Sequence, residues 1–237
     1  MGSGYGLKLG QHYYTHAKAY MDLKDRVDLV GFVDPDQERG EWAKAHWGDV
    51  ALYPDLQMAL EDAEPTVVSV CTPPESQVGV LDELRGQRVL GVWCEKPFMP
   101  KVADFDYTIQ VDYCRRFDLL HVSLRNILSE ATHRRLVVMA KKDIHTVSHM
   151  TDLARFWGVD HFDYVDTPEE PGAYFLRYKL GGDWKEMAFP AGGISGDYFM
   201  MKALENLLWS VDAGLSANSS PGSAILSEEW ANRILKG

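Results

Sequence analysis

Two short segments place reactive side chains directly after apolar runs. Cys71-Thr72-Pro73-Pro74 follows Thr66–Val70, and Cys94-Glu95-Lys96-Pro97 follows Arg88–Trp93. Such β-branched runs, separated by a polar helical stretch, are typical of neighbouring parallel strands. Ligands of open α/β sheets bind beyond the carboxyl ends of such strands. Lys96 would therefore bring a mobile ammonium group to a predicted site and is the first candidate catalytic residue. The alternative is a surface ion pair of Lys96 with Glu95 or Asp104.

A second group of polar side chains lies on a predicted helix. His145, His149 and Asp152 are spaced i, i+4 and i+7, so one helix face presents all three. Two alternatives stay open for this face. It is a solvated surface, or the two histidines chelate zinc, as histidines at i and i+4 can. Thr146 stands where a zinc protease would have its glutamate, so that motif is absent.

An acidic residue follows the first predicted strand. Asp34 comes directly after the apolar run Val27–Val33. A carboxylate at this point can accept hydrogen bonds from both ribose hydroxyls of NAD and would repel the 2′-phosphate of NADP. NAD is therefore favoured over NADP. Equally, Asp34 or Asp36 could cap the helix that follows.

These residues require an α/β framework to position them. The first half of the chain alternates apolar strands with helical stretches, which predicts right-handed βαβ units and a parallel sheet. After about residue 104 the pattern changes. Tyr107–Tyr113 alternates like a strand with one wet face, and a hairpin is predicted around Gly181 and Gly182. We predict a Rossmann-like domain over residues 1–104, followed by an α+β domain with a mostly antiparallel sheet over residues 105–237.

Composition narrows the classes of function. The 237 residues are 46% hydrophobic and 25% charged, as in ordinary globular proteins, and the net charge is −11 without any basic block. Nucleic acid is therefore an unlikely partner. No apolar run approaches the roughly 18 residues that would span a membrane. The three cysteines have neither the even count of a disulfide framework nor metal-type spacing, which favours a cytoplasmic location and no metal.

Several motifs occur together in the order of a known family. They are Asp34-Pro35-Asp36, Thr72-Pro73-Pro74, Glu95-Lys96-Pro97, Arg115-Arg116-Phe117, the helix with His145, His149 and Asp152, and Ala203-Leu204-Glu205. In this order and spacing the chain resembles the Gfo/Idh/MocA-type oxidoreductases, represented by glucose-fructose oxidoreductase and inositol dehydrogenase. His16-Ala17-Lys18-Ala19-Tyr20 also resembles the family's HAxAY segment.

The resemblance implies an NAD(P)-dependent oxidoreductase that moves a hydride between nicotinamide and a hydroxyl carbon of a sugar or polyol. Lys96 would assist proton transfer at that hydroxyl, since an amine can exchange a proton with it. His149 would be the acid or base, and Asp152 would orient it. His145 stands where the family usually has Asp, and a neutral imidazole supplies no fixed negative charge.

The resemblance also implies a cofactor site and an assembly. The residues on the cofactor side would be Gly4, Gly6, Gly10, Asp34, Thr72, Pro73 and Glu95. A homo-oligomer is expected, because the family often dimerises through the second-domain sheet. The apolar residues predicted for that surface are Phe175, Tyr178, Met187 and Phe189.

The glycine loop departs from the family pattern. A dinucleotide fingerprint needs a strand, G-x-G-x-x-G and a helix N-terminus. Gly4-x-Gly6-x-x-x-Gly10 is one residue too long, and no apolar strand precedes it. The chain thus resembles a short member with a degenerate glycine loop, whose first strand is short or missing. Two alternatives stay open: a cofactor-free relative that acts as a binding or partner subunit, and a cofactor-independent lyase or isomerase.

Overall fold

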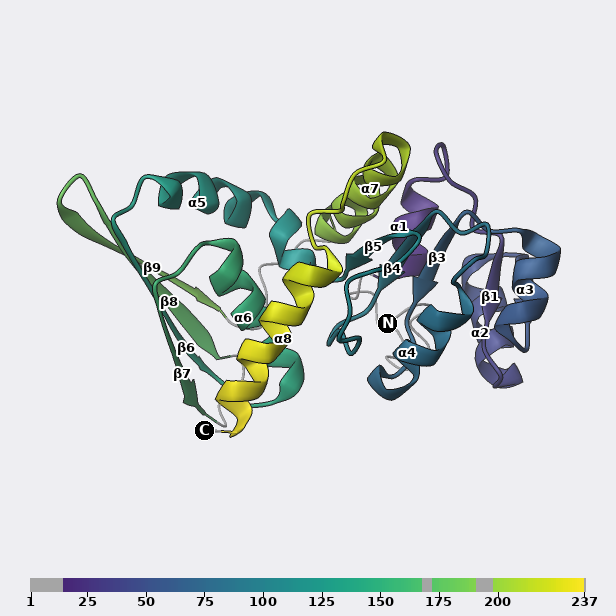
Figure 1. Ribbon diagram of the computed structural model, residues 1–237, viewed down its shortest axis with the longest axis horizontal. Coiled ribbons are helices and arrows are strands. Elements are labelled where there is room, and N and C mark those ends of the chain that lie inside the picture. Colours follow the sequence, from purple (N-terminus) through teal and green to yellow (C-terminus); the bar gives the residue numbers. More distant parts are fainter. Residues whose placement is uncertain (1–14, 168–171, 191–197, 237) are drawn as a thin grey trace. The chain divides into compact units, whose positions relative to one another are not determined.

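A computed structural model describes residues 15–167, 172–190 and 198–236 (Figure 1). The chain forms two compact units. The first comprises residues 1–112 and 200–221, and the second residues 113–199 and 222–237. The first unit therefore extends past the predicted boundary at residue 104 and includes a segment from near the end of the chain.

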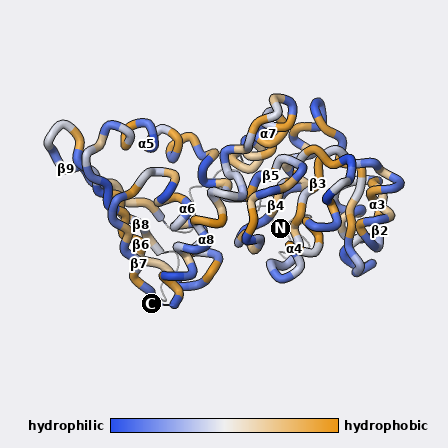
Figure 2. Tube along the Cα trace, in the orientation of Figure 1, coloured by the Kyte–Doolittle hydropathy of each residue, from blue (hydrophilic) through white to orange (hydrophobic). Residues whose placement is uncertain are grey.

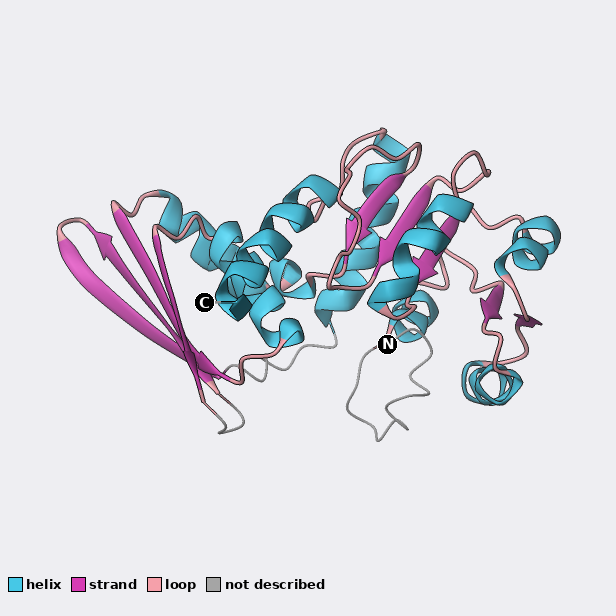
Figure 3. Cartoon of the chain, turned by 60° about the horizontal axis from the view of Figure 1, so that its bottom comes forward, coloured by secondary structure: helices cyan, strands magenta, loops and turns pink. Residues whose placement is uncertain are grey.

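The strands of the first unit are short and parallel. β1 (Gly31–Val33) pairs with β2 (Ala51–Tyr53), and β4 (Gly91–Cys94) pairs with β3 (Val67–Val70) on one side and β5 (Thr108–Val111) on the other. Within the described residues these pairings make two separate sheets, of two and three strands (Figure 3). The prediction of a parallel Rossmann-like arrangement is confirmed.

The helices of the first unit begin at side chains that bind their free backbone N–H groups. α1 (His16–Asp22), α2 (Gln37–Trp47) and α3 (Leu56–Ala63) are capped by Thr15, Asp36 and Asp55 in turn. α4 (Pro74–Glu83) instead starts with a proline, whose missing N–H needs no partner. The late helix α7 (Tyr198–Ala213) also returns to this unit from Met200 onward.

Three expectations about the first unit need correction. β5 is not a strand with one wet face: it pairs parallel with β4 and is almost wholly buried, with Gln110 at 0% exposure. The strand expected over Val27–Val33 is only Gly31–Val33. β2 was not predicted, because three residues are too few to show a period.

The second unit contains one four-stranded mixed sheet. Its order is β7 (His161–Asp166), β6 (His133–Ala140), β8 (Ala173–Leu180) and β9 (Asp183–Pro190). β6 and β7 are parallel, and the other pairs are antiparallel. The predicted hairpin is confirmed: β8 and β9 are joined at Gly181 and Gly182, whose φ angles of 60° and 92° favour glycine.

Helices cover one face of that sheet. They are α5 (Leu119–Ser129), α6 (Ile144–Phe156) and α8 (Pro221–Lys236), preceded by a short 3₁₀ helix at Cys114–Phe117. The core between them is built on side chains such as Leu136, Val138 and Leu176, each fully buried. Figure 2 shows how apolar stretches alternate with polar ones along both units. No helix in the described part of the chain is long and apolar enough to cross a bilayer.

Candidate active site

The two strand-end segments lie at one edge of the β3–β4–β5 sheet. Val70 pairs with Cys94, and Cys94 pairs with Val111, so the residues that follow these three emerge side by side. The main-chain N–H of Glu95 donates to Val70 (2.9 Å), and that of Asp112 donates to Cys94 (2.8 Å). The predicted neighbourhood of the two segments is therefore confirmed.

Lys96 is presented by a buried turn at this edge. Within Gly91–Phe98, all of which the structure describes, every residue is buried except Lys96, which is partly exposed. The turn therefore excludes water from the backbone around the lysine while leaving the side chain a way out. This is the burial pattern expected of a group that acts on a ligand at the strand ends.

A buried polar cluster lies directly beside Lys96. His16 Nε2 is 3.5 Å from Glu95 Oε1 and 3.7 Å from Asp112 Oδ2. On the other side of the ring, Nδ1 is 3.0 Å from the Ser69 hydroxyl. The ring also packs on Trp93, with centroids 3.7 Å apart, and all three titratable side chains are almost inaccessible to water. The cluster thus joins α1 to the ends of β4 and β5.

The charges of this cluster follow from its burial and contacts. Burial by itself lowers the pKa of His16, but Cys71, Asp112 and Glu95 together raise it well above its usual value. Burial likewise raises the pKa of the Glu95 carboxyl, but the hydrogen bond and charge of His16 lower it to about 2. For Asp112 burial dominates and raises the pKa. These directions describe an imidazolium beside the Glu95 carboxylate, with Asp112 made less acidic by its burial.

The same three groups could in principle hold a metal ion. Their ligand atoms lie within 4.8 Å of one another, and no ion is needed to explain their approach. A doubly protonated ring donates to Ser69 through Nδ1 and towards the carboxylates through Nε2, and a positive ring is favoured on the face of Trp93. A proton therefore accounts for every contact that the structure shows.

Sequence reasoning missed His16 and Asp112 as members of this site. The register of β4 and β5 brings Asp112 beside Glu95, and His16 reaches the same place from helix α1. The available signal was the resemblance of His16–Tyr20 to the family's HAxAY segment. Glu95, expected on the cofactor side, turns its carboxylate to His16 and is 6% exposed.

The other residues expected on the cofactor side lie at strand ends of the first unit. Asp34 follows β1, is partly exposed, and accepts a hydrogen bond from the N–H of Asp36 (2.9 Å). Asp36, not Asp34, caps α2. Thr72 and Pro73 follow β3, and the buried Thr72 hydroxyl oxygen has no hydrogen-bond partner in the described residues. Gly4, Gly6 and Gly10 lie outside the described residues.

The candidate residues of the second unit share helix α6, as predicted, but differ in burial. His145 is exposed, His149 is partly exposed and Asp152 is buried. Arg116 binds both carboxylate oxygens of Asp152, with Nε 2.7 Å from Oδ2. Ser227 donates to the same carboxylate (3.1 Å). Asp152 therefore ties α6 to Arg116 and to α8.

His149 adjoins a second buried polar cluster. The ring of Tyr113 meets that of His149 edge-on, with centroids 6.1 Å apart. The Tyr113 hydroxyl donates to Glu228 and is 3.2 Å from the hydroxyl of Ser148. Burial and the charge of Glu228 raise the pKa of Tyr113 well above its usual value, so its hydroxyl keeps its proton.

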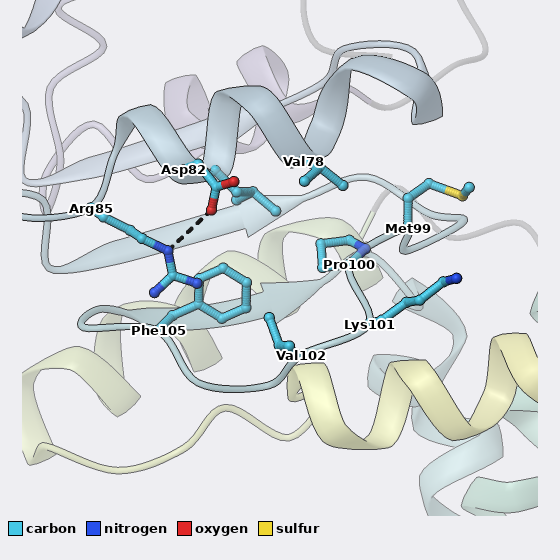
Figure 4. A pocket seen from close by; sticks show the side chains of 9 residues that line it. Val78, Asp82, Arg85, Met99, Pro100, Lys101, Val102 and Phe105 are labelled. Atoms are coloured by element: carbon cyan, nitrogen blue, oxygen red, sulfur yellow. Dashed lines mark hydrogen bonds and ion pairs between the residues drawn. The ribbon is translucent and has the colours of Figure 1, made fainter.

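A pocket of about 330 Å³ lies between α4 and the segment after Lys96 (Figure 4). Its wall is mostly apolar, from Val78, Met99 and Val102, and Arg85 stacks over Phe105 with its guanidinium 4.4 Å from the ring centre. Asp82 accepts a hydrogen bond from Arg85 (3.1 Å). Asp82 and Arg85 thus pair with each other, Lys101 adds an exposed ammonium group to the lining, and the apolar wall offers a surface for an apolar group.

Comparison with known proteins decides the family of the first unit. Residues 4–112 match the oxidoreductase family described as having an NAD-binding Rossmann fold, GFO_IDH_MocA. This segment belongs to the Gfo/Idh/MocA oxidoreductases. The predicted resemblance is thereby confirmed, and the motifs at Thr72 and Glu95–Pro97 fall inside the matched range. No curated protein sequence matches the chain.

Solved structures that cover both units show that the fold of the whole chain is shared with known dehydrogenases. One similar structure is described as a probable dehydrogenase from Thermotoga maritima, with a TM-score of 0.76, 12% identity, and coverage of 93% of this chain and 92% of that one. A myo-inositol dehydrogenase from Corynebacterium glutamicum gives a TM-score of 0.71 at 11% identity, covering 96% and 94%. An Agrobacterium radiobacter oxidoreductase in complex with NAD⁺, L-tartaric acid and magnesium gives 0.71 at 12%, covering 92% and 91%.

Proposed function

We propose that the protein is an NAD-dependent oxidoreductase that acts on a hydroxyl carbon of a sugar or polyol. The observation that carries this proposal is Lys96, the partly exposed residue of an otherwise buried turn in the unit that matches an NAD-binding family. Oxidation of a hydroxyl carbon requires a base for the hydroxyl proton as well as an acceptor for the hydride. Bound NAD supplies the hydride acceptor, and Lys96 assists the proton transfer.

Two side chains at the strand ends suit a dinucleotide. The Asp34 carboxylate follows β1, where it can accept hydrogen bonds from ribose hydroxyls, and it would repel a 2′-phosphate. The buried Thr72 hydroxyl oxygen, unpartnered in the described residues, can bind a polar group beside β3. We therefore assign Asp34, Thr72 and Pro73 to the cofactor and favour NAD over NADP.

The role proposed for His149 rests on its position on α6 and on the side chains around it. It is partly exposed on α6, and the buried cluster of Tyr113, Ser148 and Glu228 fixes the helix around it. We propose His149 as the acid or base that exchanges the substrate proton and Asp152 as a residue that holds α6 in place through Arg116. His145 is exposed, and we propose that it contributes to substrate binding.

One feature of the sequence favours the cofactor-free alternative. Gly4, Gly6 and Gly10, which lie outside the described residues, are spaced one residue too widely for the dinucleotide fingerprint. A family member of this kind would keep the fold and act as a partner subunit, or catalyse elimination or isomerisation with Lys96 and His149 alone.

Titration with NADH separates these functions. We expect saturable enhancement of nicotinamide fluorescence, with NADH binding more tightly than NADPH. Asp34→Ala should weaken NADH binding and reduce the preference over NADPH, because the carboxylate is then lost. The absence of saturable binding at millimolar NADH would contradict the oxidoreductase function and favour the cofactor-free alternative.

The catalytic role of Lys96 is tested by substitution. Lys96→Ala should lower kcat on the best polyol substrate by about 10²–10⁴-fold, the usual contribution of general acid–base catalysis, and leave NADH affinity within about twofold. Lys101→Ala, an exposed lysine of the same segment, is the control and should leave both unchanged. Equal losses of turnover and NADH affinity in Lys96→Ala would show that Lys96 is structural.

A further inference from the structure

One side chain holds both ends of the turn that presents Lys96. Gln77, on α4, is fully buried. Its Nε2 donates to the main-chain oxygen of Glu95 (2.8 Å), and its Oε1 accepts from the main-chain N–H of Met99 (3.2 Å). These two main-chain groups lie on either side of Lys96–Phe98. The side-chain amide therefore links the two ends of the turn by one hydrogen bond at each end.

The bonding capacity of the amide matches this task closely. A glutamine offers a donor and an acceptor a fixed distance apart, and here both bind main-chain groups of the same turn. Replacing it with an apolar side chain would leave a buried carbonyl and a buried N–H without a partner, and each costs free energy. A change in the conformation of the turn would let water reach this carbonyl and this N–H at the lowest cost in free energy. The same change would move Lys96.

The turn has a second anchor at its first residue. The Glu95 N–H donates to Val70 (2.9 Å), and the Glu95 carboxylate faces His16 at 3.5 Å. Glu95 is thus fixed through its side chain, its N–H and its carbonyl. Beyond Lys96, Gln77 accepts a hydrogen bond from the main-chain N–H of Met99, whose side chain is exposed.

We propose that Gln77 is a positioning residue for Lys96, holding the turn so that the ammonium group has one orientation at the strand ends. The proposal rests on the proposed function only in assigning chemistry to Lys96. The orientation of the lysine can be measured without cofactor or substrate, so the two proposals can fail separately.

The decisive measurement is the NMR signal of the lysine side chain. In full-length protein labelled with ε-¹³C-lysine, the Lys96 signal is assigned by its loss in Lys96→Arg. We expect two inequivalent Hε protons in the wild type, because the side chain has one orientation. In Gln77→Leu they should collapse to one averaged signal. The matched control is Gln57→Leu, which removes an exposed glutamine of α3 that donates to Glu61 (2.6 Å), and it should leave Lys96 unchanged.

Kinetics adds a readout that a purely structural role would not move. Gln77→Leu should lower kcat by about tenfold to a hundredfold, the loss expected for a displacement of about 1 Å, and leave NADH affinity within about twofold. The assays are run below the melting temperature of the variant, as established by circular dichroism, so that unfolding does not contribute.

A conservative variant provides the rescue. In Gln77→Glu the protonated acid can still donate to Glu95 and accept from Met99, whereas the carboxylate cannot donate. Burial favours the neutral acid, so the two Lys96 Hε signals should be resolved at low pH and should merge as pH rises. The other charged groups nearby in sequence are Glu95 and Lys96 on the turn and Glu75 and Asp82 on α4, and the wild-type titration measures their effect.

The outcomes separate clearly. An averaged Lys96 signal in the wild type, or an unchanged signal in folded Gln77→Leu, would overturn the positioning role. A collapsed signal in Gln77→Leu together with rescue in Gln77→Glu would support it, even if the wild type binds no NADH. In that case the oxidoreductase function would fail alone.

Discussion

At the scale of single residues, three titratable side chains of the first unit lie where water is excluded. His16, Glu95 and Asp112 are buried, and a buried charge is tolerated only when it is paired and hydrogen-bonded. The imidazolium is hydrogen-bonded to Ser69 through Nδ1, and through Nε2 it lies at ion-pair distances of 3.5 and 3.7 Å from Glu95 and Asp112. This pairing makes the stability of the first unit dependent on pH.

We expect stability to be greatest at mildly acidic pH. The folded pKa of Glu95, about 2, is below its unfolded value of 4.5, so its contribution is present above about 4.5 and is lost as pH falls towards 2. The folded pKa of His16 is raised, so its contribution is full below about 6.5 and is lost as pH rises through the folded pKa. Asp112, whose pKa is raised, acts in the opposite direction to Glu95. Urea unfolding between pH 4 and 10 measures the profile.

Removing the imidazole tests this assignment. His16→Gln should lower the free energy of unfolding at pH 6 by roughly 3–5 kcal/mol, because Glu95 is left as a buried charge. It should also abolish the decline at alkaline pH. His46→Gln is the control, since His46 also stacks on a tryptophan, Trp42, but is exposed. Unfolding curves of His16→Gln that follow the wild type at every pH would contradict the charged pair.

The sequence predicts the position of Lys96 at a strand end, because its neighbours in the chain indicate where the strand stops. An apolar run, a charged pair and a proline identify a strand end and the residue that leaves it. Gln77 and His16 contact Glu95 although they are far from it in the sequence. Gln77 is separated from Glu95 by 18 positions. A glutamine within a helix has the same sequence signature whether it caps a turn or faces water, so only the structure distinguishes the two.

At the scale of elements, α7 is a helix that packs against the three-stranded sheet. Its residues pack onto β4 at Gly91, where a Cβ atom would lie 2.8 Å from a methyl of Val211. Gln110 of β5 donates to the main-chain oxygen of Ala203 on the same helix. The absence of a side chain at Gly91 therefore permits the close approach of helix and strand.

Filling this space should destabilise the protein. Gly91→Ala is expected to lower the free energy of unfolding by about 1–3 kcal/mol, because the added methyl overpacks the contact with Val211. Val211→Ala in the same chain should recover part of the loss, which a double-mutant cycle measures. Gly79→Ala, at an open position within α4, should instead raise stability by roughly 0.5–1 kcal/mol. Additive effects at Gly91 and Val211 would contradict the contact.

Long helices and strands can be predicted from the sequence pattern, whereas strands of three residues cannot. α6 and the β8–β9 hairpin are set by helical spacing and by a glycine turn, and both were predicted. β1 and β2 have three residues each, so their pairing, not their pattern, defines them. β5 alternates like a half-exposed strand, but its Gln110 is buried and donates to Ala203, and Asp112, directly after the strand, lies 3.7 Å from His16 inside the unit.

At the scale of the whole molecule, the sheet of the second unit has one face away from its core. Of the residues expected on an open face, Tyr178 and Phe189 belong to the core and Met187 packs against it. Phe175 lies on the other face, opposite Val137 in the register. We propose that this face, with Met139 and Val165 exposed at 41% and 46%, binds a second copy of the chain.

Light scattering coupled to size exclusion tests this assembly. We expect the wild type to elute as a dimer or larger and Phe175→Lys to elute as a folded monomer, because a charge in the middle of the face cannot be buried cheaply. Leu119→Lys is the control: Leu119 is 66% exposed on α5, and its replacement should leave the mass unchanged. A monomeric wild type would contradict the proposal.

The return of residues 200–221 to the first unit has a consequence for how the protein is made. The chain emerges from the ribosome from its amino end, so β3, β4 and β5 are synthesised long before α7. Until then Gly91 and its neighbours lack the helix that covers them. The second unit, of which all but residues 222–237 lies within the intervening segment, can therefore begin to fold first. During synthesis the nascent first unit would expose a sheet surface that a chaperone can recognise.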